Sequence, residues 1–299
     1  MSAPHRNSPA RPSPGGDAGN SGSSRPAREF RFDDRDFERV RRLIYAHAGI
    51  SLGDSKRDMV YGRVTRRLRA LKLKSFAEYL ARLESDELEF EEFVNSLTTN
   101  LTAFFREEHH FPILAELLRR HAADGTVSLW SAACSTGEEA YSMAITAIET
   151  LGPNPRVRIL GTDLDTRAVR TADLGIYPLE RVEKLGAERL KRFFLKGTGD
   201  KAGYARVRPE VRALVRFRPM NLMTPAWPIR GPFHAIFCRN AMIYFDRAAQ
   251  RRVLERFRPL LHPDGRLFAG HAEGLSHCAD LFEPEGRTVY RPGGDTSMR

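Results

Sequence analysis

The chain has 299 residues, enough for one large domain or two ordinary ones, and its net charge of +10 suits nucleic acid, a membrane surface or an acidic protein. No apolar run approaches the roughly 18 residues of a membrane span, and the N-terminus lacks the apolar core of a signal peptide. The three cysteines, Cys134, Cys238 and Cys278, lie far apart without a C-x-x-C pair, which argues against disulfides or a zinc site. We therefore expect a cytoplasmic protein with no membrane insertion and no metal.

Residues 1–28 are rich in Pro, Gly and Ser and contain almost no large apolar side chains. Such a segment cannot bury enough surface to offset the entropy lost on ordering, so we predict a disordered tail. Residues 293–299 are predicted to be a second, short tail.

Residues 29–98 predict a small all-α N-terminal domain. The helical spacing of apolar residues recurs in residues 37–44, 56–71 and 76–83. The run Gly49–Gly53 is predicted to end the first helix and to separate it from the second. The acidic run over residues 84–92 is predicted to be a solvated helix face.

The second of these helices has a strongly basic side. Between Lys56 and Lys74 there are eight basic residues and one acid, Asp58. Solvated helix faces usually mix charges of both signs, so an acidic partner is as good an explanation as a plain surface. The candidate partner-binding residues on this side are Arg63, Arg66 and Arg69.

A dense group of polar side chains beside two aromatic residues follows, from Asn95 to Glu107. Asn100, Thr102 and Arg106 stand within seven residues of one another, directly before a helix and a strand. This segment is either an interdomain connection or a wall over a binding site.

The stretch Val127–Ser142 predicts a strand, a turn of small residues and a helix, which is the first βα unit of a nucleotide-binding sheet. Gly137 is the one glycine in the turn, so the G-x-G-x-x-G of a pyrophosphate cradle is missing and NAD is not expected. Two capping boxes fit the helix start, Thr136 with Glu139 and Ser135 with Glu138. One glutamate suffices for capping, which leaves the other carboxylate for a cationic ligand.

The second strand, residues 157–165, ends in two acids about 25 residues beyond the first turn, near the spacing of a ribose-binding carboxylate. We predict that Asp163 binds ribose hydroxyls and that Asp165 caps the helix over residues 166–174.

Residues 178–218 interrupt the α/β pattern with short strands and Gly turns, and we predict a small antiparallel insert that includes residues 214–218. Tyr204, Arg206 and Arg208 share one face, and the outer edge either accepts a peptide strand or is a structural flap. The ends of the main parallel strands meet at one edge of the sheet, where ligands bind. These ends are predicted at Ala132, Asp163, Asn221 and Asn240.

Together, these motifs resemble those of the chemotaxis receptor methyltransferases, the CheR family. The matching pieces stand in the family's order: Asn100–Glu107, Ser131–Ser142, Gly161–Asp163, Met220–Leu222, Arg239–Asn240 and Ile243–Phe245. The resemblance covers residues 30–292. Ala140 and Ala241 depart from the family's usual Pro and Val or Ile, and neither change removes a polar contact.

The resemblance implies an α/β fold: a Rossmann-like S-adenosylmethionine-dependent methyltransferase domain over residues 99–292 with the β insert at 178–218, preceded by the all-α domain. The family methylates glutamate side chains on the cytoplasmic helices of chemotaxis receptors and releases S-adenosylhomocysteine. Carried over residue by residue, the implied cofactor contacts are Asn100, Thr102, Arg106, Ala132, Glu138, Asp163, Asn221, Leu222, Arg239 and Asn240. Arg106 and Tyr244 would line the reaction centre. In this family the basic helix faces the acidic methylation region, and in some members the insert docks a receptor C-terminal peptide.

This chemistry suits the residues present. A glutamate side chain in water has a pKa of about 4.3 and is an anion at neutral pH, so its attack on a sulfonium methyl needs no general base. The Tyr244 hydroxyl can hold the acceptor carboxylate, and it can equally be a packing aromatic beside Phe245. We favour Arg106 on the cofactor, because a strong pair with the acceptor carboxylate would quench the nucleophile.

Three rival interpretations stay open. A nucleic-acid methyltransferase suits the basic charge, but enzymes that methylate amines carry Asn/Asp-Pro-Pro-Tyr where this chain has Arg239-Asn240-Ala241-Met242, so we expect no nucleic-acid partner. A cofactor-binding module without activity conflicts with the presence of Arg106 and Tyr244. A receptor of a pathway other than motility is equally compatible.

Overall fold

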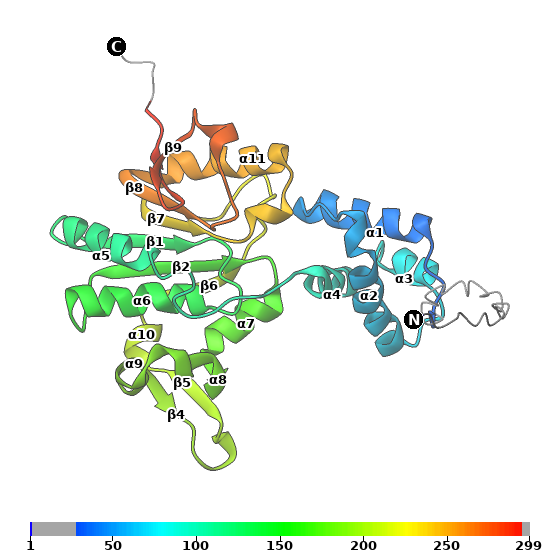
Figure 1. Ribbon diagram of the computed structural model, residues 1–299, viewed down its shortest axis with the longest axis horizontal. Coiled ribbons are helices and arrows are strands. Elements are labelled where there is room, and N and C mark those ends of the chain that lie inside the picture. The colour runs from blue at the N-terminus through cyan, green and yellow to red at the C-terminus, as the bar shows by residue number, and fades with distance from the viewer. Residues whose placement is uncertain (2–27, 295–299) are drawn as a thin grey trace.

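The computed structural model describes residue 1 and residues 28–294. The predicted disorder of residues 1–28 therefore falls almost wholly outside the described residues, as does most of the predicted C-terminal tail. Two lobes lie side by side, a small helical lobe and a larger α/β lobe from which an insert projects (Figure 1). Within the described ranges, no helix combines the length and the apolar character needed to cross a membrane.

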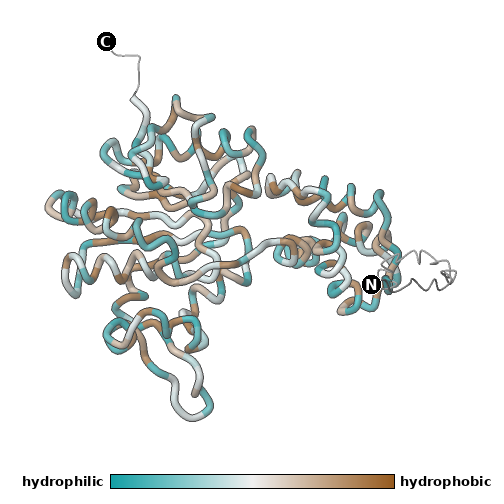
Figure 2. The backbone as a smooth tube through the Cα atoms, in the orientation of Figure 1, coloured by the Kyte–Doolittle hydropathy of each residue, from teal (hydrophilic) through white to brown (hydrophobic). Residues whose placement is uncertain are grey.

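The N-terminal lobe is all helical, as predicted. Its helices are α1 (Asp34–Ala48), α2 (Arg57–Leu71), α3 (Phe76–Arg82) and α4 (Glu87–Leu97). Side chains that accept from the first free N–H groups set three helix starts, namely those of Asp33, Ser75 and Asp86. The apolar stripes of α1 and α2 meet in one core, where Ile44 and Val64 are completely buried. Figure 2 shows the alternation of hydrophobic and hydrophilic residues along these amphipathic helices.

The acidic run over residues 84–92 is not a uniformly solvated face. Glu89 is only 5% exposed, and its carboxylate accepts from Arg67 at 2.6 and 2.9 Å and from the Tyr79 hydroxyl at 2.9 Å. The prediction was wrong at Glu89 because the half-buried Arg67 on α2 compensates its charge.

The large lobe is built on a seven-stranded sheet with the order β6-β2-β1-β7-β8-β10-β9. Five strands are parallel: β1 (Val127–Ser131), β2 (Val157–Asp163), β6 (Val215–Pro219), β7 (Phe233–Cys238) and β8 (Leu261–Ala269). The last two, β9 (Phe282–Gly286) and β10 (Val289–Pro292), are antiparallel. The helices of this lobe are α5 (His110–His121), α6 (Glu138–Leu151), α7 (Thr166–Leu174) and α11 (Arg247–Phe257).

Successive side chains of β1 enter two different cores, as a strand covered on both faces requires. Leu129 packs in the cluster that contains α5 and α6, and Trp130 packs in the cluster that contains α11. The predicted fold class, an α/β methyltransferase domain behind an all-α domain, is confirmed.

The insert contains a three-stranded antiparallel sheet with the order β3-β5-β4. Its elements are β3 (Ile176–Pro178), α8 (Leu179–Val182), α9 (Ala187–Phe193), β4 (Phe194–Lys196), β5 (Tyr204–Val207) and α10 (Pro209–Arg212). Tyr204 and Arg206 share the exposed face of β5, as predicted, whereas Arg208 lies just beyond the strand and is only partly exposed. Because β5 is the central strand, the free edges of this sheet belong to β3 and β4.

The assignment of residues 214–218 to the insert was wrong. All but the first of these residues lie in β6, which pairs in parallel with β2 of the main sheet in a register that joins Ile159 to Val215 and Asp163 to Pro219. As an edge strand, β6 exposes Arg216 and Arg218, and this polar alternation imitates an antiparallel strand.

Candidate active site

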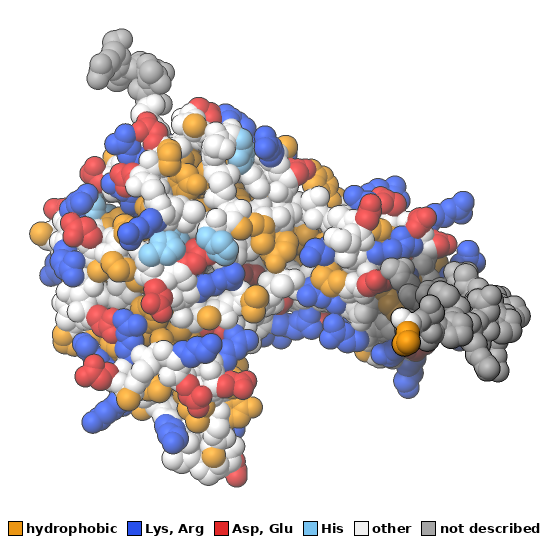
Figure 3. Space-filling view, in the orientation of Figure 1, with side chains coloured by type: hydrophobic (Ala, Val, Ile, Leu, Met, Phe, Trp, Pro, Cys, Tyr) orange, Lys and Arg blue, Asp and Glu red, His pale blue; other side chains and the backbone are white. Residues whose placement is uncertain are grey.

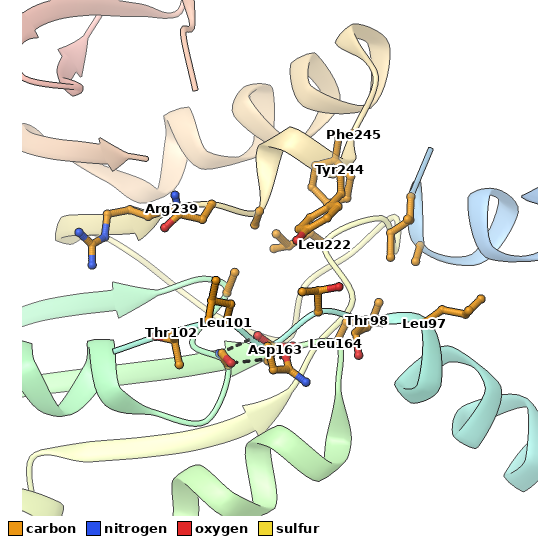
Figure 4. A pocket seen from close by; sticks show the side chains of 18 of the residues that line it. Leu97, Thr98, Leu101, Thr102, Asp163, Leu164, Leu222, Arg239, Tyr244 and Phe245 are labelled. Carbon is orange, nitrogen blue, oxygen red and sulfur yellow. Dashed lines mark hydrogen bonds between the residues drawn. The ribbon is translucent and has the colours of Figure 1, made fainter. Parts of the chain in front are cut away.

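A cavity of about 370 Å³ lies where the carboxyl ends of the parallel strands meet the N-terminal lobe. Such strand ends are the usual ligand position in an α/β sheet. The predicted site residues that line it are Arg63, Asn100, Thr102, Arg106, Ala132, Asp163, Asn221, Leu222, Arg239, Asn240 and Tyr244. Figure 4 shows Tyr244 and Asp163 on opposite sides of this cavity.

Glu138 is not among the lining residues. It is completely buried, and its carboxylate accepts from Arg181 of the insert at 2.6 Å and from the Thr136 hydroxyl at 2.7 Å. Contact with a cofactor would therefore require the Glu138–Arg181 pair to open.

Both predicted capping boxes at the start of α6 were wrong. The N-cap is Gly137 with φ of +98°, and no side chain caps the helix. A Cβ at this position would lie 2.7 Å from Cβ of Ala172, so glycine is required both by the backbone conformation and by the packing of the turn. The first turn of α6 thus keeps its N–H groups free of side-chain caps, close to the cavity.

Glu139, one residue further on, lines the cavity and belongs to a buried network. Its carboxylate accepts from the Ser131 hydroxyl at 2.6 Å and from Nε of Arg239 at 2.7 Å. The Arg239 side chain is only 2% exposed, and its Nη1 donates to the carbonyl oxygen of Arg106 at 2.6 Å. Figure 4 shows its guanidinium pointing away from Tyr244. Arg239 therefore holds the loop of Arg106 rather than presenting its charge to the cavity.

Glu107, His109 and His110 each place one ligand atom within 4.8 Å of the others, a spacing that would suit a metal ion. However, Nδ1 of His110 accepts from Arg239 at 3.1 Å, and Nε2 lies 2.9 Å from the carbonyl oxygen of Arg287, which puts the proton on Nε2. Both ring nitrogens of His110 are occupied, so we assign no metal to this group.

Asp163 ends β2, and its carboxylate accepts from the backbone N–H groups of Ser135 at 2.7 Å and Asp165 at 2.9 Å. Burial outweighs these bonds and raises the pKa of Asp163 to about 6. A carboxylate has about four acceptor positions, so the ionised group retains capacity for further donors such as a ribose diol.

Asp165 caps α7, as predicted, by accepting from the N–H groups of Arg167 and Ala168. It also accepts from the Thr98 hydroxyl and from Nδ2 of Asn100, each at 2.7 Å. The polar segment before the first strand is therefore tied to the sheet edge, where it forms a wall of the cavity.

Two other predicted contacts already have partners. Nδ2 of Asn221 donates to the carbonyl oxygen of His47 at 2.6 Å, and Oδ1 accepts from the N–H of Met223. Asn240 adopts a left-handed φ of +59°, and its N–H donates to Glu273 at 2.8 Å.

The basic side of α2 divides into two parts. Arg63 is half-buried, lines the cavity and donates to the carbonyl oxygens of Leu97 and Thr98 at 2.8 and 2.7 Å. Burial lowers the pKa of Arg63. Arg66 and Arg69 are exposed and do not line the cavity, and Arg69 pairs with Glu29. Lys and Arg side chains gather in the concavity between the N-terminal lobe and the insert (Figure 3).

Sequence reasoning missed the contribution of the connection between α1 and α2. The additional lining residues from this part of the chain are Ala48, Ile50, Ser51, Leu52, Lys56 and Met59. The available signal was the Gly49–Gly53 break, which was interpreted only as the end of a helix.

The "CheR methyltransferase, SAM binding domain" family matches residues 100–291, and the "CheR methyltransferase, all-alpha domain" family matches residues 35–98. The chain is 53% identical over 266 residues to the "Chemotaxis protein methyltransferase 2" of Pseudomonas aeruginosa, which covers 88% of this chain and 95% of that one. It is 52% identical over 260 residues to the "Chemotaxis protein methyltransferase" of Escherichia coli, which covers 86% and 90%. These matches confirm the predicted family and the predicted cofactor, S-adenosylmethionine. The chain belongs to the CheR methyltransferase family.

Proposed function

We propose that this methyltransferase transfers the methyl group of S-adenosylmethionine to glutamate side chains on the cytoplasmic helices of chemotaxis receptors, and that it acts in the cytoplasm. The product on the receptor is a glutamate methyl ester. The names of the relatives support the receptor target, and the cavity supports the chemistry. The observation that carries the proposal is the position of Asp163 and Tyr244 on opposite sides of one cavity.

The lining residues suit each part of the cofactor. Asp163 offers an acceptor to the ribose hydroxyls, and Leu222 and Leu164 offer apolar surface to the adenine. Asn100, Thr102, Arg106, Asn221 and Asn240 supply the remaining polar contacts. Arg106 provides a positive charge for the carboxylate at the amino-acid end of the cofactor. Arg239 acts through the loop of Arg106.

When bound, the cofactor supplies a methyl group on a positively charged sulfur. The acceptor glutamate is already ionised, so the chain has to orient it and does not have to remove a proton. We assign this role to the Tyr244 hydroxyl, which would donate to one carboxylate oxygen while the other oxygen attacks. The new oxygen–carbon bond forms as the sulfur–carbon bond breaks. Such orientation can lower the barrier by on the order of 7 kcal/mol.

The basic side of α2 is the proposed docking surface for the acidic receptor helices. Arg66 and Arg69 have exposed side chains on α2, and Arg63 connects this surface to the cavity wall. The free edges of β3 and β4 are the proposed site for a receptor C-terminal peptide.

The test is transfer of a tritiated methyl group to receptor-containing membranes, with Tyr244→Phe as the matched variant. We expect base-labile label on the receptor and strongly reduced label with the variant. Label on duplex DNA or RNA instead of the receptor would support the nucleic-acid alternative and contradict the proposal.

A further inference from the structure

We propose that the connection between α1 and α2 is a positioning element for Tyr244, so that the N-terminal lobe both docks the partner and sets the catalytic side chain. This inference rests on the role proposed above for Tyr244. It assigns a catalytic consequence to the Gly49–Gly53 break, which has no role in the proposed function.

The first observation is a direct backbone link between the lobes. The N–H of Ser51 donates to the carbonyl oxygen of Tyr244 at 2.8 Å, and Ile50 forms an antiparallel bridge with Phe245. The bond therefore runs from the residue after Ile50 to the residue before Phe245. This pattern makes Ile50 and Phe245 a non-hydrogen-bonded pair, the arrangement in which antiparallel chains approach most closely.

The second observation is that neighbouring carbonyls of the same segment have partners inside the large lobe. Nε2 of Gln250 donates to the carbonyl oxygens of Met242 and Phe245 at 2.9 and 3.1 Å. The carbonyl oxygen of Tyr244 instead accepts from Ser51. The N–H of Tyr244 donates to the carbonyl oxygen of Ala241 at 3.1 Å inside the large lobe, so each lobe holds one backbone group of the tyrosine.

The third observation is a side-chain hydrogen bond to Asp246, two residues after Tyr244 in the chain. The Tyr45 hydroxyl donates to Oδ2 of Asp246 at 2.6 Å, and Oδ1 of Asp246 accepts from the N–H of Ala249 at the start of α11. The segment from Tyr244 to Asp246 is therefore attached to α1 and its following loop at two points.

The loop itself has a constrained path. Gly49 adopts a left-handed φ of +67°, and a Cβ there would lie 2.5 Å from Sδ of Met223. The neighbouring carbonyl oxygen of His47 accepts from Asn221. Residues 47–51 therefore contact two parts of the large lobe. One is the loop after β6, which carries the proposed cofactor contact Asn221, and the other is the segment that carries Tyr244.

The first test is Tyr45→Phe, which removes an exposed hydroxyl without altering a core. We expect kcat for receptor methylation to fall about five-fold, the worth of one hydrogen bond, with unchanged affinity for S-adenosylhomocysteine by calorimetry. Tyr61→Phe in α2 is the matched control, because it loses a hydrogen bond to Phe30 inside the N-terminal lobe and leaves the loop untouched. We expect normal kcat for this control. Equal losses for the two variants, or a loss of cofactor affinity with Tyr45→Phe, would overturn the proposal.

The second test restores the link covalently. Cysteines at positions 50 and 245 occupy a non-hydrogen-bonded pair, whose spacing suits a disulfide, and the native cysteines are buried. Two double-cysteine proteins are compared, one with Tyr45 and one with Tyr45→Phe. We expect oxidation to raise kcat of the Tyr45→Phe protein to the kcat of the oxidised protein that keeps Tyr45. A deficit that persists after oxidation would overturn the proposal. Tyr244→Phe in the same assay separates the two hypotheses, because normal turnover of that variant would refute the role of Tyr244 itself.

Discussion

Nη1 of Arg239 donates a hydrogen bond of 2.6 Å to the carbonyl oxygen of Arg106, across 133 positions of the chain. The same guanidinium bonds the carboxylate of Glu139. One buried cation therefore joins the end of β7, the start of α6 and the loop that precedes α5. Through this arrangement, Arg239 fixes the position of the Arg106 loop, which forms one wall of the cavity.

We predict that Arg239→Gln lowers the free energy of unfolding by about 3–5 kcal/mol, because it leaves the buried carboxylate of Glu139 without its partner. Urea unfolding measures this change. Arg251→Gln is the control, since Arg251 forms exposed pairs with Glu255 and Asp280 and should cost less than about 1 kcal/mol. Similar losses for the two variants would contradict the assigned network.

We predict that Asp163→Asn weakens binding of S-adenosylhomocysteine about 10- to 100-fold, the worth of a hydrogen bond to a charged group. Because the pKa of Asp163 is raised to about 6, the wild-type affinity should fall as the pH drops below 6 and the carboxylate becomes protonated. Calorimetry between pH 5 and 8 checks both effects. The Asn variant should lose this pH dependence, whereas Asp173→Asn on the exposed part of α7 should retain it.

One buried and one half-buried histidine should make the fold sensitive to acid. Burial and the Arg239 cation lower the pKa of His110 to about 4, and burial also lowers the pKa of His234. A histidine whose folded pKa is lowered stabilises the fold above its unfolded pKa of about 6.5, and this stability is lost as the pH falls from there toward the folded pKa. For His110 the full loss is on the order of 3 kcal/mol.

Asp163, with its raised pKa, acts in the opposite direction, so the measurement compares variants by urea unfolding at pH 7.5 and 5. His234→Asn keeps an acceptor for the N–H of Ser128 and removes the titrating ring, so its stability should fall less on acidification. An unchanged pH dependence of His234→Asn would contradict this account.

We predict that the double reversal of Arg66 and Arg69 to Glu reduces receptor methylation at least ten-fold at low salt and leaves cofactor affinity intact. These side chains are exposed on α2 and do not reach the cavity, so the change acts on docking. Reversal of Arg119 and Arg120 on the exposed side of α5 is the charge-matched control. Equal methylation by the two double variants at low salt would remove α2 from the docking surface.

The site residues that follow directly after a strand could be predicted from the sequence to lie at the sheet edge. Asp163 and Asn240 come at the ends of apolar runs, so their place at the sheet edge followed from period and topology. The two glutamates of α6 are different: consecutive helix positions point about 100° apart, and which of them faces the cavity depends on how α6 packs. Only the structure shows that Glu138 meets Arg181 of the insert.

The contribution of the N-terminal lobe was beyond the reach of local patterns. The bond between Ser51 and Tyr244 joins residues far apart in the chain, and neither residue carries a local sign of the other. In the same way, the edge strand β6 alternates polar and apolar residues, a pattern that does not distinguish a sheet edge from an antiparallel insert.

The central claim is that this cavity delivers a methyl group from S-adenosylmethionine to an ionised glutamate of a receptor. The most direct measurement is mass spectrometry of a receptor cytoplasmic fragment after incubation with the enzyme and trideuteromethyl-labelled cofactor. The account predicts trideuteromethyl esters on glutamates that mild base removes and that form much more slowly with Asp163→Asn and Tyr244→Phe. Label on another side chain, or glutamate esters formed equally by those two variants, would contradict it.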